Sequence, residues 1–282
     1  MHKFADRMFI TLSLAALMFT LLMLFALLVD VFVDGVTRLN GQFLTSFPSR
    51  KPEEAGILAA LVGSVSLITL TAAIAVPLGV GSAVYLEQYA KRSRFNALMD
   101  INIGTLAGVP SIIYGLLGLA LFVRVLALDR SLISGALTLS LLILPIIIIA
   151  SREAIRVVPT SLQDGAFAIG ATRSQVIRRI VFPLALPGIL TGIILALSRA
   201  IGETAPLIAI GALTYIAFLP DSLSSPFTAM PIQIFNWVSR PQEAFHANAA
   251  AGIILLLAIT LLFNAVAICT RNHFYKISAH CS

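Results

Sequence analysis

The stretch that decides the fold comprises residues 184–219, which read LALPGILTGIILALSRAIGETAPLIAIGALTYIAFL. Its 36 residues hold only two charged side chains, Arg199 and Glu203. At about 1.5 Å per residue, a straight helix of this length would be about 54 Å long, whereas the hydrocarbon core of a membrane is about 30 Å thick. The stretch therefore predicts a membrane-spanning helix that breaks near its middle, where Gly202 and Pro206 lie.

The rest of the chain has the same apolar character. Of its 282 residues, 59% are hydrophobic and 11% are charged, and the mean hydropathy is +0.97. A water-soluble domain of this size has no core large enough for so much apolar surface, so the composition predicts an integral membrane protein. The two cysteines, Cys269 and Cys281, lie in an apolar run and in the tail, and nothing suggests that they pair. A disulfide-stapled secreted domain is therefore excluded.

Apolar runs of at least about 20 residues predict six transmembrane helices and an all-α fold. The first run follows His2, Lys3 and Arg7 as a signal peptide would, but it is too long for a signal-peptide core and lacks a small-residue cleavage pattern, so we expect it to be retained. The second run carries Pro77, Gly79 and Gly81 towards its inner end, where we expect a bend. The expected spans are 9–29, 56–86, 101–123, 132–150, 184–219 and 249–269.

The distribution of Lys and Arg predicts the orientation of these spans. If the amino terminus is cytoplasmic, twelve cations fall on the inside and six on the outside, as the positive-inside rule requires, and both termini are cytoplasmic. The net charge of +6 is then a topology signal and does not indicate nucleic-acid binding. The inner cations are Lys3, Arg7, Lys91, Arg92, Arg94, Arg152, Arg156, Arg173, Arg178, Arg179, Arg271 and Lys276, and the outer ones are Arg38, Arg50, Lys51, Arg124, Arg130 and Arg240.

The longest cytoplasmic segment, residues 151–183, reads as two short helices joined by a sharp turn. Ser161 with Asp164 predicts a cap for the first helix, and Thr172 with Gln175 predicts a capping box for the second. Gly170 between them can adopt the positive φ that ends a helix. The small Gly165, Ala166 and Ala168 and the apolar Leu162, Phe167 and Ile169 predict a surface on which another protein docks.

The spacing in this segment resembles a loop of the permease subunits of ATP-binding-cassette importers. The matching residues are Asp164-Gly165-Ala166, Gly170 four positions later, and Ile180, Phe182 and Pro183; the family usually has Glu, Ala and Leu where this chain has Asp164, Gly165 and Phe182. The resemblance implies a short helix that enters a cleft of an ATPase subunit. That ATPase, with its ATP and Mg²⁺, lies on another chain, because no Gly-rich phosphate loop ending in Gly-Lys-Ser/Thr occurs here. A helical hairpin that merely seals the inner face is the alternative. The residues implied in ATPase coupling are Ser161, Leu162, Asp164, Gly165, Ala166, Phe167, Gly170 and Ile180.

Further stretches resemble phosphate-importer permeases in particular, from about Gly56 to Arg271. They are Tyr85–Ala90, Ala107–Gly115 and Arg199–Leu207, and the Glu203-Thr-Ala-Pro206 form, with Met230–Phe235 and Asn264, resembles the A-type subunit of these importers. The resemblance implies a type I (MetI-like) importer architecture in a bacterial inner membrane, contacting membrane lipid. It implies a homologous C-type permease, two ATP-binding subunits and a periplasmic phosphate-binding protein as partners. The expected division is 1–55 for the first span and its outer loop, 56–271 for the permease domain and 272–282 for a cytoplasmic tail.

The chemistry of the substrate path centres on Arg199 and Glu203, which stand at i and i+4 near mid-membrane. A charge there costs at least about 3 kcal/mol unless it is paired or faces water, so such residues usually mark function. The planar guanidinium of Arg199 suits phosphate oxygens, Glu203 would hold it in place, and Gly202 and Pro206 would let the gate flex. Ser111 and Ser64 are further candidates for the path, although such hydroxyls more often bond the preceding helical turn.

Several alternatives remain at this point. The Arg199–Glu203 pair could be a staple without substrate contact, and Arg199 alone does not distinguish phosphate from sulfate or molybdate. A secondary carrier would need mid-membrane carboxylates, and beyond Glu203 the spans offer only Asp30, near an edge. An intramembrane hydrolase is disfavoured because the spans hold no Ser or Cys nucleophile with a His base and no metal-ligand motif, so we expect no catalytic and no metal-binding residues.

Overall fold

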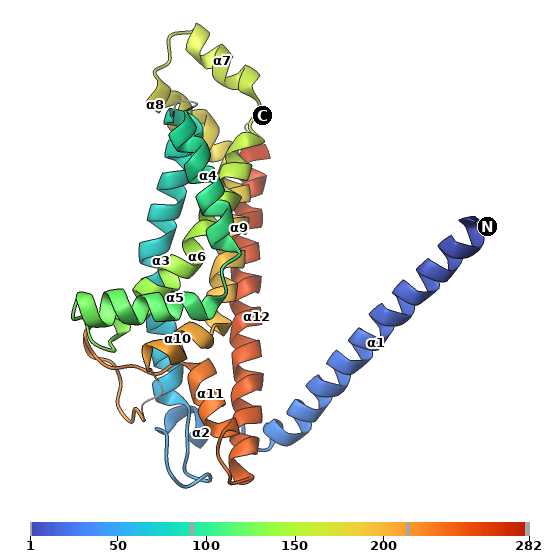
Figure 1. Cartoon of the computed structure of the whole chain (residues 1–282), viewed down its shortest axis with the longest axis vertical. Helices are drawn as coiled ribbons and strands as arrows, with labels where there is room; N and C mark the ends of the chain where they lie inside the picture. Colours follow the sequence, from blue (N-terminus) through green and yellow to red (C-terminus); the bar gives the residue numbers. More distant parts are fainter. Residues whose placement is uncertain (1, 91–92, 213–214, 280–282) are drawn as a thin grey trace.

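The structure is a computed structural model that describes residues 2–90, 93–212 and 215–279. Lys91, Arg92 and Cys281 of the sequence predictions lie outside the described residues. The described chain is almost entirely helical, as predicted (Figure 1). The α-helices are α1 (His2–Val36), α2 (Gly41–Thr45), α3 (Leu58–Val84), α4 (Arg94–Ala107), α5 (Ser111–Gly118), α6 (Leu132–Arg156), α7 (Thr160–Ala168), α8 (Arg173–Val176), α9 (Phe182–Gly202), α10 (Ala205–Ile210), α11 (Met230–Val238) and α12 (Ala244–Ala279), with π-helical turns η1 (Tyr85–Tyr89), η2 (Leu119–Val125) and η3 (Ile177–Val181).

Within the described residues, five helices are long and apolar enough to cross a membrane, and the number is six if one bent helix pair is counted as a crossing. The five are Met8–Val36, Leu58–Tyr89, Leu132–Arg156, Arg173–Gly202 and Ala244–Asn272. The six predicted spans agree with the larger of these two counts. The helices extend beyond the apolar runs, so Arg152, Arg156 and Arg173 lie within helices rather than in a loop.

The third crossing is not the single helix that the run 101–123 predicts. It consists of residues 96–107 and 111–125, which meet at an angle of 103° (Figure 1). The cause is local: Gly108 ends α4, and Pro110 disfavours helical backbone at Val109 and lacks an N–H to continue the hydrogen-bond ladder. As a result α5 runs crosswise to the long helices.

The bend expected near Pro77 is also wrong, because the helix passes through Pro77 without a break and ends at Tyr89. Packing against α6 holds this region together. An ideal Cβ on Gly79 would lie 2.6 Å from Cγ2 of Ile147, so the two helices approach closely where the glycine lies. Prolines within membrane helices are tolerated when neighbouring helices support the backbone in this way.

The helix α6 forms the centre of the bundle, and 67% of its most apolar 18-residue segment is buried. Its neighbours α3 and α9 pack along it, and Ile143 and Ile147 of α6 are fully buried between them. In contrast to α6, α1 has no buried residue in its most apolar 18-residue segment. It packs against α12 at Gly35, where a Cβ would lie 2.6 Å from the backbone of Ala250, and then diverges from the bundle (Figure 1).

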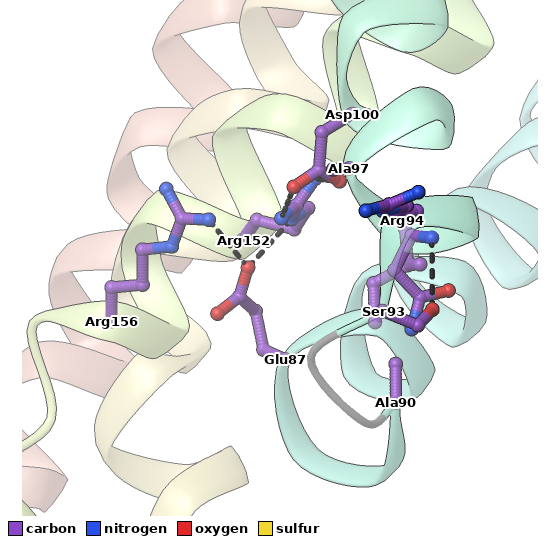
Figure 2. Close-up of a pocket in the computed structure, with 10 residues that line it drawn as sticks. Glu87, Ala90, Ser93, Arg94, Ala97, Asp100, Arg152 and Arg156 are labelled. Atoms are coloured by element: carbon purple, nitrogen blue, oxygen red, sulfur yellow. Dashed lines mark hydrogen bonds and ion pairs between the residues drawn. The ribbon is translucent and has the colours of Figure 1, made fainter.

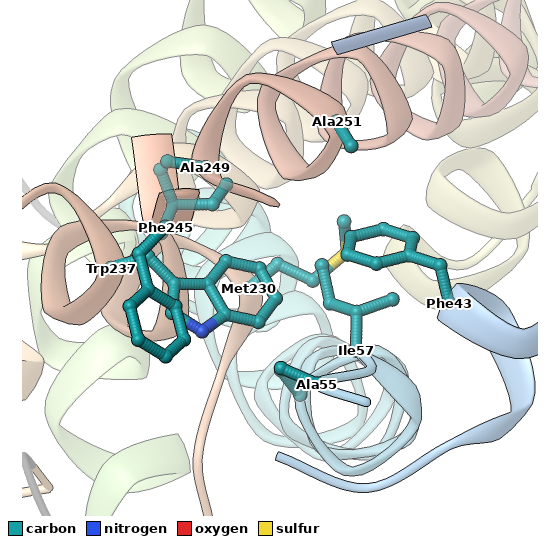
Figure 3. Packing of buried hydrophobic residues seen from close by; sticks show 10 residues of the cluster. Phe43, Ala55, Ile57, Met230, Trp237, Phe245, Ala249 and Ala251 are labelled. Carbon is teal, nitrogen blue, oxygen red and sulfur yellow. The ribbon is translucent and has the colours of Figure 1, made fainter. Parts of the chain in front are cut away.

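The end of the bundle that carries α2 is closed by an apolar cap (Figure 3). Trp237 of α11 is fully buried, and its ring centroid lies 5.7 Å from that of Phe43 of α2. Beside the cap, Arg38 ties the loop after α2 to α12. Its Nε donates to Oδ1 of Asn248 over 2.6 Å, and its Nη2 donates to the carbonyls of Pro52 at 2.6 Å, Ala55 at 3.3 Å and Glu53.

Replacing Arg38 with alanine is expected to lower the free energy of unfolding by about 2–3 kcal/mol, because the amide of the fully buried Asn248 and several carbonyls lose a charged donor. Thermal unfolding in detergent measures this as a lower Tm. Arg50→Ala is the matched control, since Arg50 is exposed and no hydrogen bond of its side chain is found among the described residues. Equal Tm values for the two variants would show that the hydrogen bonds of Arg38 do not stabilise the fold.

Candidate functional site

The loop predicted to be cytoplasmic and to dock, residues 151–183, lies at one end of the molecule, where α7 projects beyond the long helices (Figure 1). The chain reverses after α7 at Gly170, whose φ is +87°. The N–H of Gly170 donates to the Phe167 carbonyl and that of Ala171 to the Ala166 carbonyl, both at 3.0 Å, which satisfies the end of the helix. The predicted turn is therefore confirmed.

The two predicted caps of this loop have different outcomes. The box formed by Thr172 and Gln175 is present: the Thr172 N–H donates to Oε1 of Gln175 over 2.8 Å, and the Gln175 N–H donates to Oγ1 of Thr172 over 3.4 Å. The cap predicted from Ser161 and Asp164 is wrong, because α7 begins at Thr160 after Pro159 and has no side-chain cap. Pro159 is itself the N-cap residue and has no side-chain acceptor, so Ser161 falls inside the first turn.

The side chains of α7 divide into an outer and an inner set. Leu162 and Phe167 are exposed to 48% and 42%, and Ile169, which directly follows α7, is exposed to 87%. Ala166 is buried, and Ile180 of η3 is partly buried, in an apolar cluster at the inner ends of α3, α6 and α9. The inner residues hold α7 in place, and the outer ones form an apolar surface beside Asp164 and Gly165, which are both exposed.

The second candidate region is the break after α9. The helix ends at Gly202, and Glu203 has extended backbone, with φ −72° and ψ 123°. Nε of Arg199 lies 3.2 Å from Oε1 of Glu203, so the predicted pair exists. The Arg199 side chain is 46% exposed and that of Glu203 only 14%. The pair therefore fixes the carboxylate inside the fold and leaves much of the guanidinium accessible.

Two short helices meet beside this break. Pro206 lies in the first turn of α10, and an ideal Cβ on Gly115 of α5 would lie 2.6 Å from Cα of Pro206, so only glycine permits this contact. Tyr114, next to Gly115, donates its hydroxyl hydrogen to the Leu106 carbonyl over 2.8 Å. Ser111 is half-buried at the first position of α5.

Ser64 does not join this group of residues. It is buried in α3, and its Oγ accepts a hydrogen bond from the Met230 N–H over 2.8 Å, which anchors the start of α11. Thr69 and Thr71 of α3 donate to the carbonyls of Val65 and Leu67 of the preceding turn, each at 2.8 Å, as is usual for hydroxyls in membrane helices.

Sequence reasoning missed a charged cluster at the inner ends of α3, α4 and α6 (Figure 2). Arg152 of α6 donates to Glu87 of η1 over 2.6 Å and to both oxygens of Asp100 of α4, at 2.5 and 3.0 Å. Arg156 lies 2.9 Å from the same Glu87 oxygen. The cluster borders a cavity of about 830 Å³. Its members are far apart in sequence, and the only available signal was the presence of opposite charges at the inner ends of three spans.

These features can be compared with known proteins. Residues 75–274, well over half of the chain, match the family model described as the binding-protein-dependent transport system inner membrane component.

The chain belongs to this family.

Among relatives of this inner membrane component, a protein named phosphate transport system permease protein PstA 1, from Mycobacterium tuberculosis, is 32% identical over 84% of this chain and 78% of its own length. A protein named phosphate transport system permease protein PstA, from Haemophilus influenzae, is 31% identical over 93% and 92%. The probable ABC transporter permease protein YqgI of Bacillus subtilis is 32% identical over 89% and 91%.

Solved structures share the fold of this family member. A chain of a bacterial alginate ABC transporter, solved with an alginate-bound periplasmic protein, matches with a TM-score of 0.69 at 16% identity over 93% of both chains. A chain of the MetNI methionine ABC transporter, in an inward-facing conformation, matches with a TM-score of 0.60 at 19% identity over 78% of this chain and 94% of its own. The chain is thus an ABC importer permease in fold, and such subunits are not themselves enzymes.

Proposed function

We propose that this chain is the A-type permease subunit of an ATP-driven phosphate importer in a bacterial inner membrane. The observation that supports phosphate as the substrate is that relatives named as phosphate transport permeases align with most of this chain, 84% of it for the Mycobacterium protein and 93% for the Haemophilus protein. The exposed Arg199 beside a helix break supports the same substrate class, because a guanidinium binds oxyanions with planar, charge-assisted hydrogen bonds.

The proposed path runs past Arg199 where α9 gives way to α10. Arg199 makes a transient contact with phosphate, and Glu203 holds the guanidinium and weakens its grip on the anion by competing for it. Gly202 has open space around its Cα. Because Pro206 has no N–H, the carbonyl of Gly202 has no helical donor, and it accepts a 3.4 Å hydrogen bond from the Thr204 hydroxyl instead. This backbone can rearrange at low cost, as a gate requires. Ser111 belongs to the proposed path, whereas the Ser64 hydroxyl anchors the start of α11 by accepting from the Met230 N–H.

The outer surface of α7 is the proposed contact with an ATPase subunit that binds ATP and Mg²⁺. Exposed Leu162, Phe167 and Ile169 supply apolar area, and Gly165 lets a partner backbone approach. ATP binding to two such subunits closes them and opens the path outward, and hydrolysis resets it inward. The permease contributes no bond chemistry; it needs only two arrangements that nucleotide and the loaded binding protein stabilise differently.

The remaining partners are a homologous C-type permease and a periplasmic phosphate-binding protein. The half-exposed Arg199 supports a second membrane subunit, because a charged group at this depth needs a partner or a water-filled path. The excess of cations at the end that carries α7 supports a cytoplasmic position for that end and for both termini.

The test is uptake of labelled phosphate by liposomes that contain the complete complex. We expect uptake only with binding protein and hydrolysable ATP, and none with labelled sulfate or molybdate. Uptake of sulfate or molybdate in place of phosphate would reassign the substrate, and phosphate uptake with an ATPase subunit unable to hydrolyse ATP would exclude an ATP-driven importer.

A further inference from the structure

We call residues 151–183 the coupling loop. The charged cluster of Arg152, Glu87 and Asp100 is joined to α8 of this loop by a further contact. The guanidinium carbon of Arg173, the first residue of α8, lies 5.6 Å from the ring centroid of Tyr89 at the end of η1, within the range of a cation–π interaction. Two residues before Tyr89 in the chain, Glu87 of η1 accepts from Arg152 of α6. We call Arg173, Tyr89, Glu87, Arg152 and Asp100 the inner relay.

The relay holds α4 against α6. None of the residues of α4 whose side chains are described, 94 and 96–107, is buried, so apolar packing on this helix is weak. Arg152, in contrast, has a side chain only 10% exposed and grips both oxygens of Asp100. The Asp100 side chain is 44% exposed, but a two-pronged ion pair fixes geometry as well as distance. The position of α4 therefore follows that of α6 and η1.

The position of α4 in turn determines that of the path. The helix turns at Gly108–Pro110 into α5, and the hydrogen bond from Tyr114 to the Leu106 carbonyl connects the two across the turn. Gly115 of α5 contacts Pro206 of α10 without space for a methyl group, directly after the Arg199–Glu203 pair. A continuous series of tight contacts therefore joins the coupling loop to the candidate anion contact.

We propose that the inner relay transmits movement of the coupling loop to α4 and α5, with Arg152 and Asp100 as its positioning residues. When the ATPase moves α7 and α8, Arg173 displaces η1 through Tyr89, and Arg152 carries the displacement to α4 through Asp100. This proposal rests on the proposed function, since it assigns the step between ATP hydrolysis and the opening of the phosphate path.

The test measures the number of labelled phosphate ions imported per ATP hydrolysed by the reconstituted complex. Asp100→Asn and Tyr89→Leu are each expected to lower this ratio about tenfold while complex assembly and ATP hydrolysis persist. The matched controls are Asp129→Asn, in the loop between η2 and α6, and Tyr85→Leu, in the same π-helical turn as Tyr89; neither side chain has an ion pair or cation–π contact among the described residues. Both controls are expected to keep the wild-type ratio.

The double variant separates transmission from a loss of stability. If both residues belong to one relay, Asp100→Asn with Tyr89→Leu lowers the ratio no further than the stronger single change, whereas independent damage adds. Wild-type ratios in both single variants, or equal losses in the controls, would overturn the relay. Tyr89 is 44% exposed, so its replacement leaves the fold intact. Absence of ATP-dependent phosphate uptake by the wild-type complex would instead overturn the proposed function.

Discussion

Arg199→Ala is expected to lower the rate of phosphate uptake by about 100-fold while the complex still assembles and hydrolyses ATP. The loss of a charge-assisted hydrogen bond to the anion at the gate accounts for this size, since such a bond contributes about 1.5–3 kcal/mol and a 100-fold change in rate corresponds to about 2.7 kcal/mol. Assembly persists because the side chain is 46% exposed, and its one hydrogen bond among the described residues is to Glu203. The measurement is the initial rate of labelled phosphate uptake at several phosphate concentrations.

Two further variants distinguish contact of Arg199 with the substrate from a purely structural ion pair between Arg199 and Glu203. Arg199→Lys retains the charge but loses the planar donors, so uptake should fall to an intermediate value. Glu203→Gln removes the partner but leaves the guanidinium, so it should reduce uptake far less than Arg199→Ala. A staple without substrate contact would give equal losses for Arg199→Ala and Glu203→Gln, and that result would remove Arg199 from the path.

Gly170→Val is expected to abolish coupling between the ATPase subunits and the permease. The φ of +87° at this position is strained for any β-branched residue, at a cost of about 1–3 kcal/mol, and the turn relieves this strain by losing its shape. The helix α7, which carries Leu162 and Phe167, would then lose its present orientation relative to α8. Co-purification of the ATPase subunits and stimulation of their ATP hydrolysis by loaded binding protein should both be lost.

Matched variants separate the backbone effect from the added bulk. Gly170→Asn should retain most activity, because asparagine tolerates left-handed backbone better than other residues. Gly104→Val adds the same side chain to a helical glycine of α4 with open space around it, so it should leave ATPase binding intact. Normal co-purification and stimulation with Gly170→Val would show that the turn does not shape the docking surface.

The sequence predicted the coupling loop well because its signals are local. A positive φ at Gly170 and a capping box at Thr172 depend on residues within one or two helical turns, and both are present. The cap at Ser161 was misplaced because two start signals compete there, and Pro159 begins the helix earlier. The pair of Arg199 with Glu203 was likewise readable from its i, i+4 spacing.

The third crossing shows where local signals were insufficient. Gly108 and Pro110 were visible in the sequence, yet Pro77 looked equally disruptive and the helix passes through it unbroken. The difference lies in the neighbours: α6 packs against the backbone around Gly79, whereas α5 gains its own contact with Pro206 by turning away. The inner relay was unpredictable for the same reason, since Glu87, Asp100 and Arg152 are brought together by helices that are distant in sequence.

By itself, the sequence determined the membrane environment, the six crossings, the break at Gly202 and the turn at Gly170, because hydropathy, helix length and φ preference act over a few residues at a time. Only the tertiary structure decided that Pro110 and not Pro77 breaks a helix, that Ser64 bonds to the backbone of α11, and which charges pair across α3, α4 and α6. Those outcomes depend on which surfaces meet. In a membrane, a buried charge or freed carbonyl is stable only where another helix supplies its partner.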